Sequence, residues 1–277
     1  MSVINTNVSA TIARNAIGTN ERAMATSMER LSTGLRINSA KDDAAGLAIS
    51  TRMTSQVSTL NMGVRNANDA ISMIQTVEGA SKEISNMLVR MKELAVQAAS
   101  GTYSDTDRDA LDLEFVALKA EITRVQENTA WNGMKLMHTD SGDLSIRLGD
   151  SATTINFGKW DLGAPAAGDV FSGTLSGTFD LQSDTNAIAA MGLLDTAIID
   201  ATKEQAKYGS YISSLTHTVD NLTNVAQNTD QSRSRIQDAD YAVETTNLAR
   251  TQIIAQASTA MLAQANQSKQ SVLALLQ

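Results

Sequence analysis

The side chains that most often carry chemistry in proteins are few and scattered in this 277-residue sequence. It contains no cysteine, so neither a disulfide nor a thiolate metal site can form. His138 and His217 lie far apart, without an HExxH pair or a carboxylate cluster at ligand spacing. The glycine-rich phosphate-binding motifs and the GxSxG nucleophile motif do not occur. We therefore expect no catalytic site, no cofactor and no metal site, and both histidines to be ordinary surface or packing residues.

Charged side chains gather at two places that could form polar contacts. The first, Lys41-Asp42-Asp43, has the acidic residues that a helix N-terminus favours. The second holds two arginines and two aspartates, namely Arg233, Arg235, Asp238 and Asp240. Such a run is ordinarily a solvated face, but its side chains could also pair with Asp42 and Asp43 or with a neighbouring subunit. Of these two pairings we favour the one within the chain.

The composition favours long helices over a deep globular core, with a single proline, Pro165, and 4% aromatic residues. A net charge of −8 would repel phosphate backbones and anionic lipid surfaces, so neither nucleic acid nor a membrane is an expected partner. No apolar run approaches the roughly 20 residues that cross a bilayer. The first residues also lack the features of a cleaved secretory signal. We expect a protein that is soluble, or exported by a route that leaves no cleaved peptide.

Both ends of the chain are expected to form helices with unusually few charges. Arg14 is the only charged residue in 1–20, and Lys269 is the only one after Arg250. In the N-terminal segment an apolar residue recurs at every seventh position: Val3, Ala10, Ile17, Met24 and Leu31. In the C-terminal segment one stripe holds Ile254, Met261, Ala265, Val272 and Leu275, whereas Ile253, Leu262 and Leu273 lie on another side. Solvated helices rarely have this composition, so each terminal helix should bury more than one face.

Three further segments carry heptad patterns. Apolar residues alternate in three- and four-residue steps over 57–98, where Ser81 fills one polar step, and again over 111–125. The pattern is unbroken over 187–226, where Gln205 occupies one step. These patterns predict a long helical coiled-coil rod.

Between the second and third heptad segments the composition changes abruptly. Trp131-Asn132-Gly133 ends the second helix, and half of the 16 glycines fall in 133–177. Apolar and polar residues alternate over 144–148, the period of a half-buried strand. We predict β-hairpins at about 138–182. The expected fold is therefore mainly α: a long antiparallel coiled-coil rod with a small β-hairpin subdomain and paired N- and C-terminal helices.

Five segments of the chain closely resemble bacterial flagellin. They read ERLSTGLRINSAKDDAAGLAIS (29–50), RNANDAISMIQTVEGA (65–80), ELAVQAA (93–99), SRSRIQDADYA (232–242) and MLAQANQ (261–267). They occur in the order found in flagellins and leave only about 138–182 without a detailed match. The resemblance implies that 1–42 and 240–277 form an inner domain, whose helices line the filament channel, and that 43–239 form the outer rod. Lys41-Asp42-Asp43 would lie in the spoke that connects these two shells.

The resemblance also implies a function. The chain would be a secreted structural subunit that polymerises into the extracellular flagellar filament for swimming motility. Its partners would be copies of itself, the filament cap, the hook–filament junction proteins, an export chaperone and the type III export apparatus. Flagellins with further surface domains carry them after the β region, where this chain has no room, so its filament should be thin and smooth.

The segment 90–97 resembles the stretch of flagellins that an innate immune receptor of animals recognises. Arg90 and Leu94 occupy the two central positions of that stretch. Val89 replaces a polar residue of the recognised form, and Lys92 replaces an arginine. These two departures weaken the implied receptor binding, and the heptad spacing of Leu88, Met91 and Ala95 favours a packing role.

Two other functions fit parts of the pattern. A hook–filament junction protein shares flagellin-like terminal helices but is present as a few copies at one level of the assembly. A chemoreceptor-like coiled-coil signalling hairpin would explain the heptads and the lack of cysteine. The glycine-rich β insert and the charge-poor ends count against this signalling hairpin, which needs a transmembrane or adaptor connection.

Overall fold

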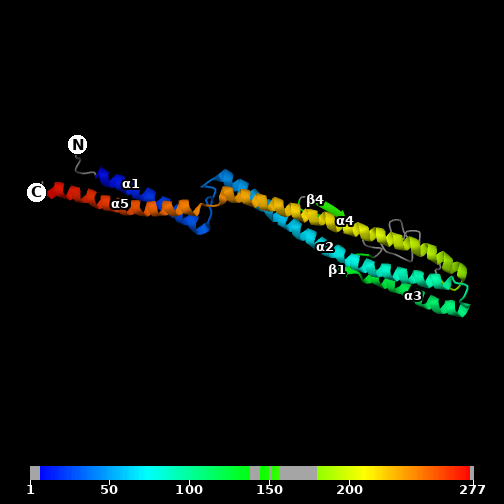
Figure 1. The fold of residues 1–277 in the computed structure, drawn as a ribbon. Coiled ribbons are helices and arrows are strands. Elements are labelled where there is room, and N and C mark those ends of the chain that lie inside the picture. The colour runs from blue at the N-terminus through cyan, green and yellow to red at the C-terminus, as the bar shows by residue number, and fades with distance from the viewer. Residues whose placement is uncertain (1–6, 138–143, 150, 156–179, 275–277) are drawn as a thin grey trace. The chain divides into compact units, whose positions relative to one another are not determined.

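The computed structural model of the chain describes residues 7–137, 144–149, 151–155 and 180–274 (Figure 1). The helices within these residues are α1 (Val8–Thr33), α2 (Ala44–Ala98), α3 (Asp105–Asn128), α4 (Asp184–Gln237) and α5 (Tyr241–Ala274). The strands are β1 (Ala130–Trp131), β2 (Met134–Lys135), β3 (Leu144–Leu148) and β4 (Ser151–Ile155). The predicted mainly α fold with a small β subdomain is confirmed.

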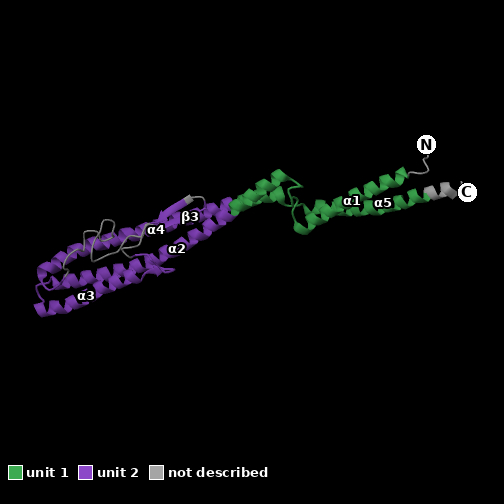
Figure 2. Cartoon of the chain, turned by 180° about the vertical axis from the view of Figure 1, so that it is seen from behind, with its two compact units in different colours: residues 1–57, 227–277 green, residues 58–226 purple. Residues whose placement is uncertain are grey.

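The chain divides into two compact units (Figure 2). Unit 1 comprises residues 1–57 and 227–277, and unit 2 comprises 58–226. The division falls inside α2 and inside α4, so each of these helices contributes to both units. The boundaries expected from the sequence, at 42/43 and 239/240, fall instead in the breaks between α1 and α2 and between α4 and α5. That these breaks separate an inner from an outer shell of a filament stays a prediction.

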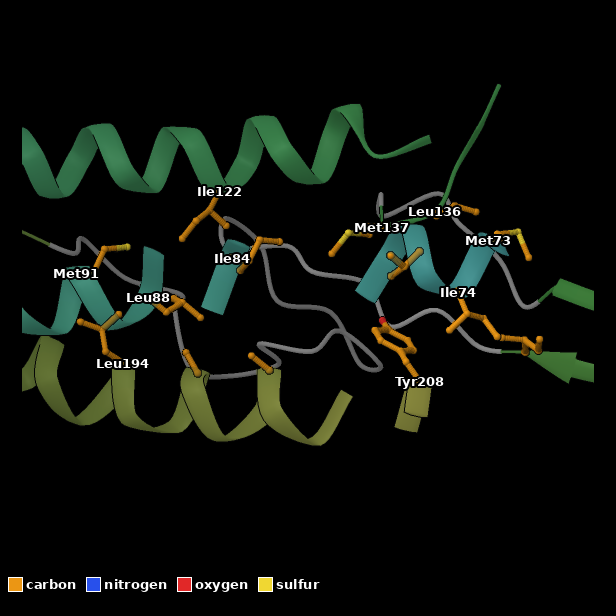
Figure 3. Close-up of a cluster of buried hydrophobic side chains, with 14 of the residues drawn as sticks. Met73, Ile74, Ile84, Leu88, Met91, Ile122, Leu136, Met137, Leu194 and Tyr208 are labelled. Atoms are coloured by element: carbon orange, nitrogen blue, oxygen red, sulfur yellow. The ribbon is translucent and has the colours of Figure 1, made fainter. Parts of the chain in front are cut away.

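Unit 2 is built around the heptad seams of α2, α3 and α4. Figure 3 shows Leu88 of α2, Ile122 of α3 and Leu194 of α4 pointing into one apolar cluster. Salt bridges join α2 to both neighbours, from Arg90 to Glu114 of α3 and from Lys92 to Asp195 of α4. Long helices hold together here because every third or fourth residue is removed from water, as the sequence predicts.

The polar steps of the two long seams meet inside unit 2. The side-chain amide of Gln205 donates to the Ser81 carbonyl oxygen at 3.2 Å and to the Ser85 hydroxyl at 2.8 Å. Because these bonds form only when the two helices are aligned at this level, they fix the register of α4 against α2.

The β3–β4 hairpin pairs antiparallel from Leu144 with Ile155 to Leu148 with Ser151, which confirms the strand predicted at 144–148. It docks directly on α2: a Cβ added to Gly63 would lie 2.7 Å from the Gly149 nitrogen. The Asn66 amide adds a hydrogen bond of 2.9 Å to the Arg147 carbonyl oxygen. Residues 138–143, 150 and 156–179 of the predicted β region lie outside the described residues.

A second hairpin, β1–β2, follows α3 directly. Asn132 and Gly133 both have positive φ, 47° and 81°, as the mirror-image two-residue turns of hairpins require. From the sequence, this Asn-Gly step is predicted only as the end of a helix. The flanking strands have two residues each, too short to show an alternating pattern.

Candidate assembly surface

Helices α1 and α5 of unit 1 form an antiparallel pair (Figure 1). Three polar contacts mark its length. Asn7 Nδ2 donates to the Ala265 carbonyl oxygen at 3.3 Å, and Asn20 Nδ2 donates to the Thr251 carbonyl oxygen at 2.7 Å. Arg30 Nη1 contacts Glu244 Oε1 at 3.0 Å. Residue numbers rise along α1 as they fall along α5, so the pair is antiparallel, as the sequence predicts.

The two helices meet along positions spaced alternately by three and four residues, which we call the α1/α5 seam. On α1 the buried or half-buried positions of the seam are Ala10, Ala13, Ile17, Asn20, Met24, Ser27 and Leu31. On α5 they are Glu244, Leu248, Thr251, Ala255, Ser258, Leu262 and Ala265. Among the described side chains of this pair, the three that are buried are Asn20, Ser27 and Glu244. Polar groups thus occupy the driest positions of the pair.

Large apolar side chains of the same two helices lie in water. Ile12 of α1 is 64% exposed, and on α5 the exposed fractions of Ile253, Ile254 and Met261 are 66%, 42% and 69%. At about 100° per residue, these three residues of α5 share one sector of the helix, together with Ala257. We call this sector the α5 outer face. The prediction that Ile253 and Leu262 share another side is therefore wrong: Ile253 lies beside Ile254, and Leu262 lies half-buried in the seam with Ala265. Contiguous apolar patches on protein surfaces are a common feature of interaction sites, so the α5 outer face is a candidate contact surface.

The assembly residues predicted from the sequence divide between these two surfaces. Four of them lie half-buried in the α1/α5 seam: Ile17, Met24, Leu31 and Ala265. Ile254 and Met261 lie on the α5 outer face. Val3, Leu275 and the side chain of Val272 lie outside the described residues. The seventh-position row on α1 is therefore one half of the contact with α5. The other half is Ala13, Asn20 and Ser27, of which the polar Asn20 and Ser27 gave no apolar signal.

The Arg30–Glu244 pair closes one end of the seam and was not foreseen. The Glu244 side chain is 7% exposed and that of Arg30 is 29% exposed. Neither Glu244 Oε2 nor Arg30 Nε has a hydrogen-bond partner among the described residues. Removing one partner would leave the other charge uncompensated in a dry position. The sequence held one signal for this pair: Glu244 lies four residues before Leu248, a spacing that places its side chain in the seam.

The segments that connect α1 to α2 and α4 to α5 pair with each other. Leu35 and Asp238 form an antiparallel bridge, the Arg36 amide donates to the Gln237 carbonyl oxygen at 2.7 Å, and the Ala239 amide donates to that of Gly34 at 2.9 Å. Both connections are thereby held by backbone hydrogen bonds, which depend little on side-chain identity.

The aspartates of these connections accept hydrogen bonds from nearby backbone amides. Asp42 Oδ2 accepts from the Asn38 and Ser39 amides, and the Ser39 amide bond is the main cause that lowers the pKa of Asp42. Asp43 accepts from the Gly46 amide at the start of α2, and Asp240 from the Ala242 amide at the start of α5.

The predicted pairing of the second charged group with Asp42 and Asp43 does not occur among the described contacts. Arg233 instead forms a salt bridge of 2.7 Å with Asp230, and Asp238 accepts from the Ser234 hydroxyl. Lys41 and Arg235 are exposed. Asp42, Asp43 and Asp240 pair with backbone amides because these donors lie close by along the chain. A salt bridge to an arginine would instead have to hold a long, flexible side chain in one position.

The remaining candidate residues lie in unit 2 or outside the described part. Arg90 is exposed and contacts both Glu93 and Glu114 at 2.9 Å, whereas Leu94 is 1% exposed within the core. His217 is exposed on α4, and His138 lies outside the described residues. Within the described ranges, no three acidic or histidine side chains are grouped as metal ligands, and no helix is long and apolar enough to span a membrane.

Comparison with known proteins gives matches across the chain. The bacterial flagellin N-terminal helical region matches residues 4–141, and the bacterial flagellin C-terminal helical region matches 191–276. A flagellin of Halalkalibacterium halodurans is 39% identical over 277 residues, with 99% of each chain covered. The flagellar filament 33 kDa core protein of Treponema phagedenis is 37% identical over 287 residues, with the same coverage.

These matches support neither a hook–filament junction protein nor a chemoreceptor-like signalling hairpin. They extend over the paired terminal helices, the helical core of unit 2 and the hairpin region alike. The chain belongs to the bacterial flagellin family.

Proposed function

We propose that α1 and α5 carry the inner contacts through which this flagellin, a structural subunit of the flagellar filament, polymerises with copies of itself. One observation carries the proposal: the most deeply buried described side chains of the α1/α5 pair are polar, while Ile12, Ile253 and Met261 are more than 60% exposed. Water-soluble helix pairs ordinarily have the reverse arrangement. The apolar side chains are placed for neighbours that a single chain does not supply.

The α1/α5 pair has little to hold it in a free subunit. Among its buried side chains, Asn20 and Glu244 form hydrogen bonds that largely replace bonds to water, so each adds only about 0.5–3 kcal/mol. Ordering the backbone costs about 1–2 kcal/mol per residue, so two long helices need apolar burial to offset that cost. We propose that α1 and α5 become fully ordered when neighbouring subunits cover their outer faces, so that folding of the ends is coupled to polymerisation.

The resemblance to flagellins adds further partners to this proposal. They are the filament cap, the hook–filament junction proteins, an export chaperone and the type III export apparatus, with the extracellular filament as the location. Binding of the innate immune receptor is the weakest of these expectations. Of its two central residues, only Arg90 is exposed, and Leu94 is held in the core of unit 2.

A charge placed on the α5 outer face tests the proposal. Ile254→Asp and Met261→Asp should abolish polymerisation of purified subunits, because each buries an unpaired carboxylate at the proposed contact. Gln252→Glu is the matched control, since helical periodicity places Gln252 on the opposite flank of α5, where it is exposed. Polymerisation is measured by sedimentation and electron microscopy, and circular dichroism of the monomers checks that the fold survives. If both aspartate variants form filaments at the wild-type monomer concentration, the outer face is not an assembly contact.

A further inference from the structure

Among the described residues, the methionines of this chain differ widely in exposure. Met261 is 69% exposed on the α5 outer face, and Met28, Met62 and Met134 are 45–56% exposed. In contrast, Met73, Met91 and Met137 are between 0% and 4% exposed in the core of unit 2. A thioether reacts with oxidants only where they can reach it, so exposure ranks these side chains for chemical modification.

We propose that Met261 is an oxidation site that controls assembly: its conversion to the sulfoxide by a peroxide prevents the subunit from polymerising, and polymerisation in turn shields it. The inference rests on the proposed assembly role of the α5 outer face. In the reaction, the sulfur lone pair attacks one peroxide oxygen and the O–O bond breaks. The sulfur gains one oxygen and loses two electrons, and the peroxide leaves as water, or as an alcohol from an organic peroxide. No other reactant is needed.

The position of Met261 makes this modification consequential. Its neighbours on the same sector of α5 are Ile254 and Ala257, so the thioether completes a continuous apolar strip along two turns. A sulfoxide turns the unbranched apolar side chain into a polar, chiral one with a strong hydrogen-bond acceptor. In a free subunit this oxygen is hydrated, because Met261 faces water. At an apolar contact it would be buried without a donor, which disfavours assembly and leaves the monomer fold unchanged.

The other exposed methionines lie elsewhere and supply controls. Met28 lies on α1, on the opposite side of the seam from Ile12, and Met62 and Met134 belong to unit 2. A background carrying Met28→Leu, Met62→Leu and Met134→Leu keeps Met261 as the one strongly exposed methionine of the described residues. Leucine has similar volume and cannot form a sulfoxide, so Met261→Leu in that background removes the reactive group and keeps the apolar strip.

The test treats monomers of both variants with hydrogen peroxide, quantifies each sulfoxide by peptide mass spectrometry, and measures the critical concentration for polymerisation. In the background variant, we expect Met261 to oxidise before Met73, Met91 and Met137, and the critical concentration to rise by about tenfold or more. The variant that also carries Met261→Leu should polymerise after peroxide as before it. Methionine sulfoxide reductases should restore assembly of the oxidised background variant. In assembled filaments, Met261 should react no faster than Met73.

Unchanged assembly of protein whose Met261 is fully converted to the sulfoxide would overturn the inference, as would rapid oxidation of Met261 inside filaments. The untreated Met261→Asp variant separates this outcome from a failure of the proposed function. If Met261→Asp blocks assembly and the sulfoxide does not, the outer face is a contact and the oxidation switch is wrong. If neither blocks assembly, the assembly role of the face is wrong as well.

Discussion

Gly63 shows how one residue places a neighbouring element. In the middle of a helix, glycine costs about 0.5–1 kcal/mol relative to alanine, so its presence there needs a reason. The reason is the β3–β4 turn, whose backbone at Gly149 lies where a Cβ of residue 63 would point, at 2.7 Å. The turn thus packs on bare helix backbone. Gly79 of the same helix meets nothing within 4 Å at its missing Cβ.

The two glycines predict opposite effects of the same substitution. Gly63→Ala should destabilise unit 2 by about 1–3 kcal/mol, because the added methyl pushes the hairpin off α2. Gly79→Ala should stabilise unit 2 by about 0.5–1 kcal/mol, because alanine restricts the backbone of the unfolded chain and its methyl group meets no neighbour in the folded helix. Urea unfolding followed by circular dichroism measures both. Equal effects of the two substitutions would show that the hairpin does not depend on close contact at Gly63.

Asp42 predicts an acid-sensitive connection in unit 1. Hydrogen bonds from the Ser39 and Asn38 amides and from the Ser39 hydroxyl lower the pKa of this carboxylate from the ordinary 3.8. A lowered folded-state pKa stabilises the fold above the unfolded value, and this contribution disappears as the pH falls from 3.8 through the folded value. The amide exchange of Ser39 should therefore accelerate below that pH. In Asp42→Ala this acid step should be missing, and its persistence would assign it to another carboxylate.

At the scale of elements, α2 and α4 owe their register to polar steps within apolar seams. The Gln205 amide bonds both the Ser81 carbonyl oxygen and the Ser85 hydroxyl, so a shift by one heptad would leave the amide without these partners. Apolar heptads alone would tolerate such a shift far better, because one leucine layer resembles the next.

A double-mutant cycle on Gln205 and Ser85 measures this contribution. Gln205→Leu and Ser85→Ala should each change the free energy of unfolding, with a coupling energy of about 0.5–1.5 kcal/mol between them. A cycle on Gln205 and the exposed Asn86 serves as the control and should give no coupling. Additive effects in the first cycle would mean that the hydrogen bond to Ser85 contributes nothing to stability.

Helices and strands whose packing follows a periodic pattern of apolar residues were predictable from the sequence. The seams of α2, α3 and α4 and the strand at 144–148 follow it directly. The seam of α1 was half predictable, because Asn20 and Ser27 lie at heptad positions without apolar side chains. The β1–β2 hairpin was missed because each of its strands has only two residues, a single period of the alternation. The Arg30–Glu244 pair depends on which chain segments meet, and the hydrogen bonds of Asp42 to Asn38 and Ser39 depend on the turn that the backbone adopts. A single pattern along the sequence specifies neither.

For the whole chain, apolar burial is distributed unevenly between the two units. The largest fully buried side chains of the described residues belong to unit 2, among them Phe115 and, in Figure 3, Tyr208 and Ile74. In the described part of unit 1, the one buried apolar side chain is that of Ile37. Since opening free energies follow buried apolar contact, unit 2 should unfold cooperatively, and α1 and α5 should open at much lower cost.

Deleting Ala257 to Gln277 tests this division. The truncated chain should keep the thermal transition of unit 2, because none of its described core side chains lies beyond Ala226, but it should not polymerise. Hydrogen exchange on the full-length monomer gives the complementary result, with weak protection of residues 250–267 and strong protection around Leu88 and Leu194. Strong protection of 250–267 before assembly would contradict coupled folding of the ends.

The polar seam between α1 and α5 also has a kinetic consequence. A helix pair that buries few apolar groups separates quickly. If α1 and α5 pair in a wrong alignment while a subunit docks at a growing tip, they therefore separate again before the next subunit arrives. The Arg30–Glu244 contact forms in one alignment only, since no other acidic side chain occupies the described α5 side of the seam. Rapid separation, together with one alignment that the salt bridge stabilises, lets wrong alignments be corrected during growth. A fully apolar seam would separate more slowly and would retain wrong alignments for longer.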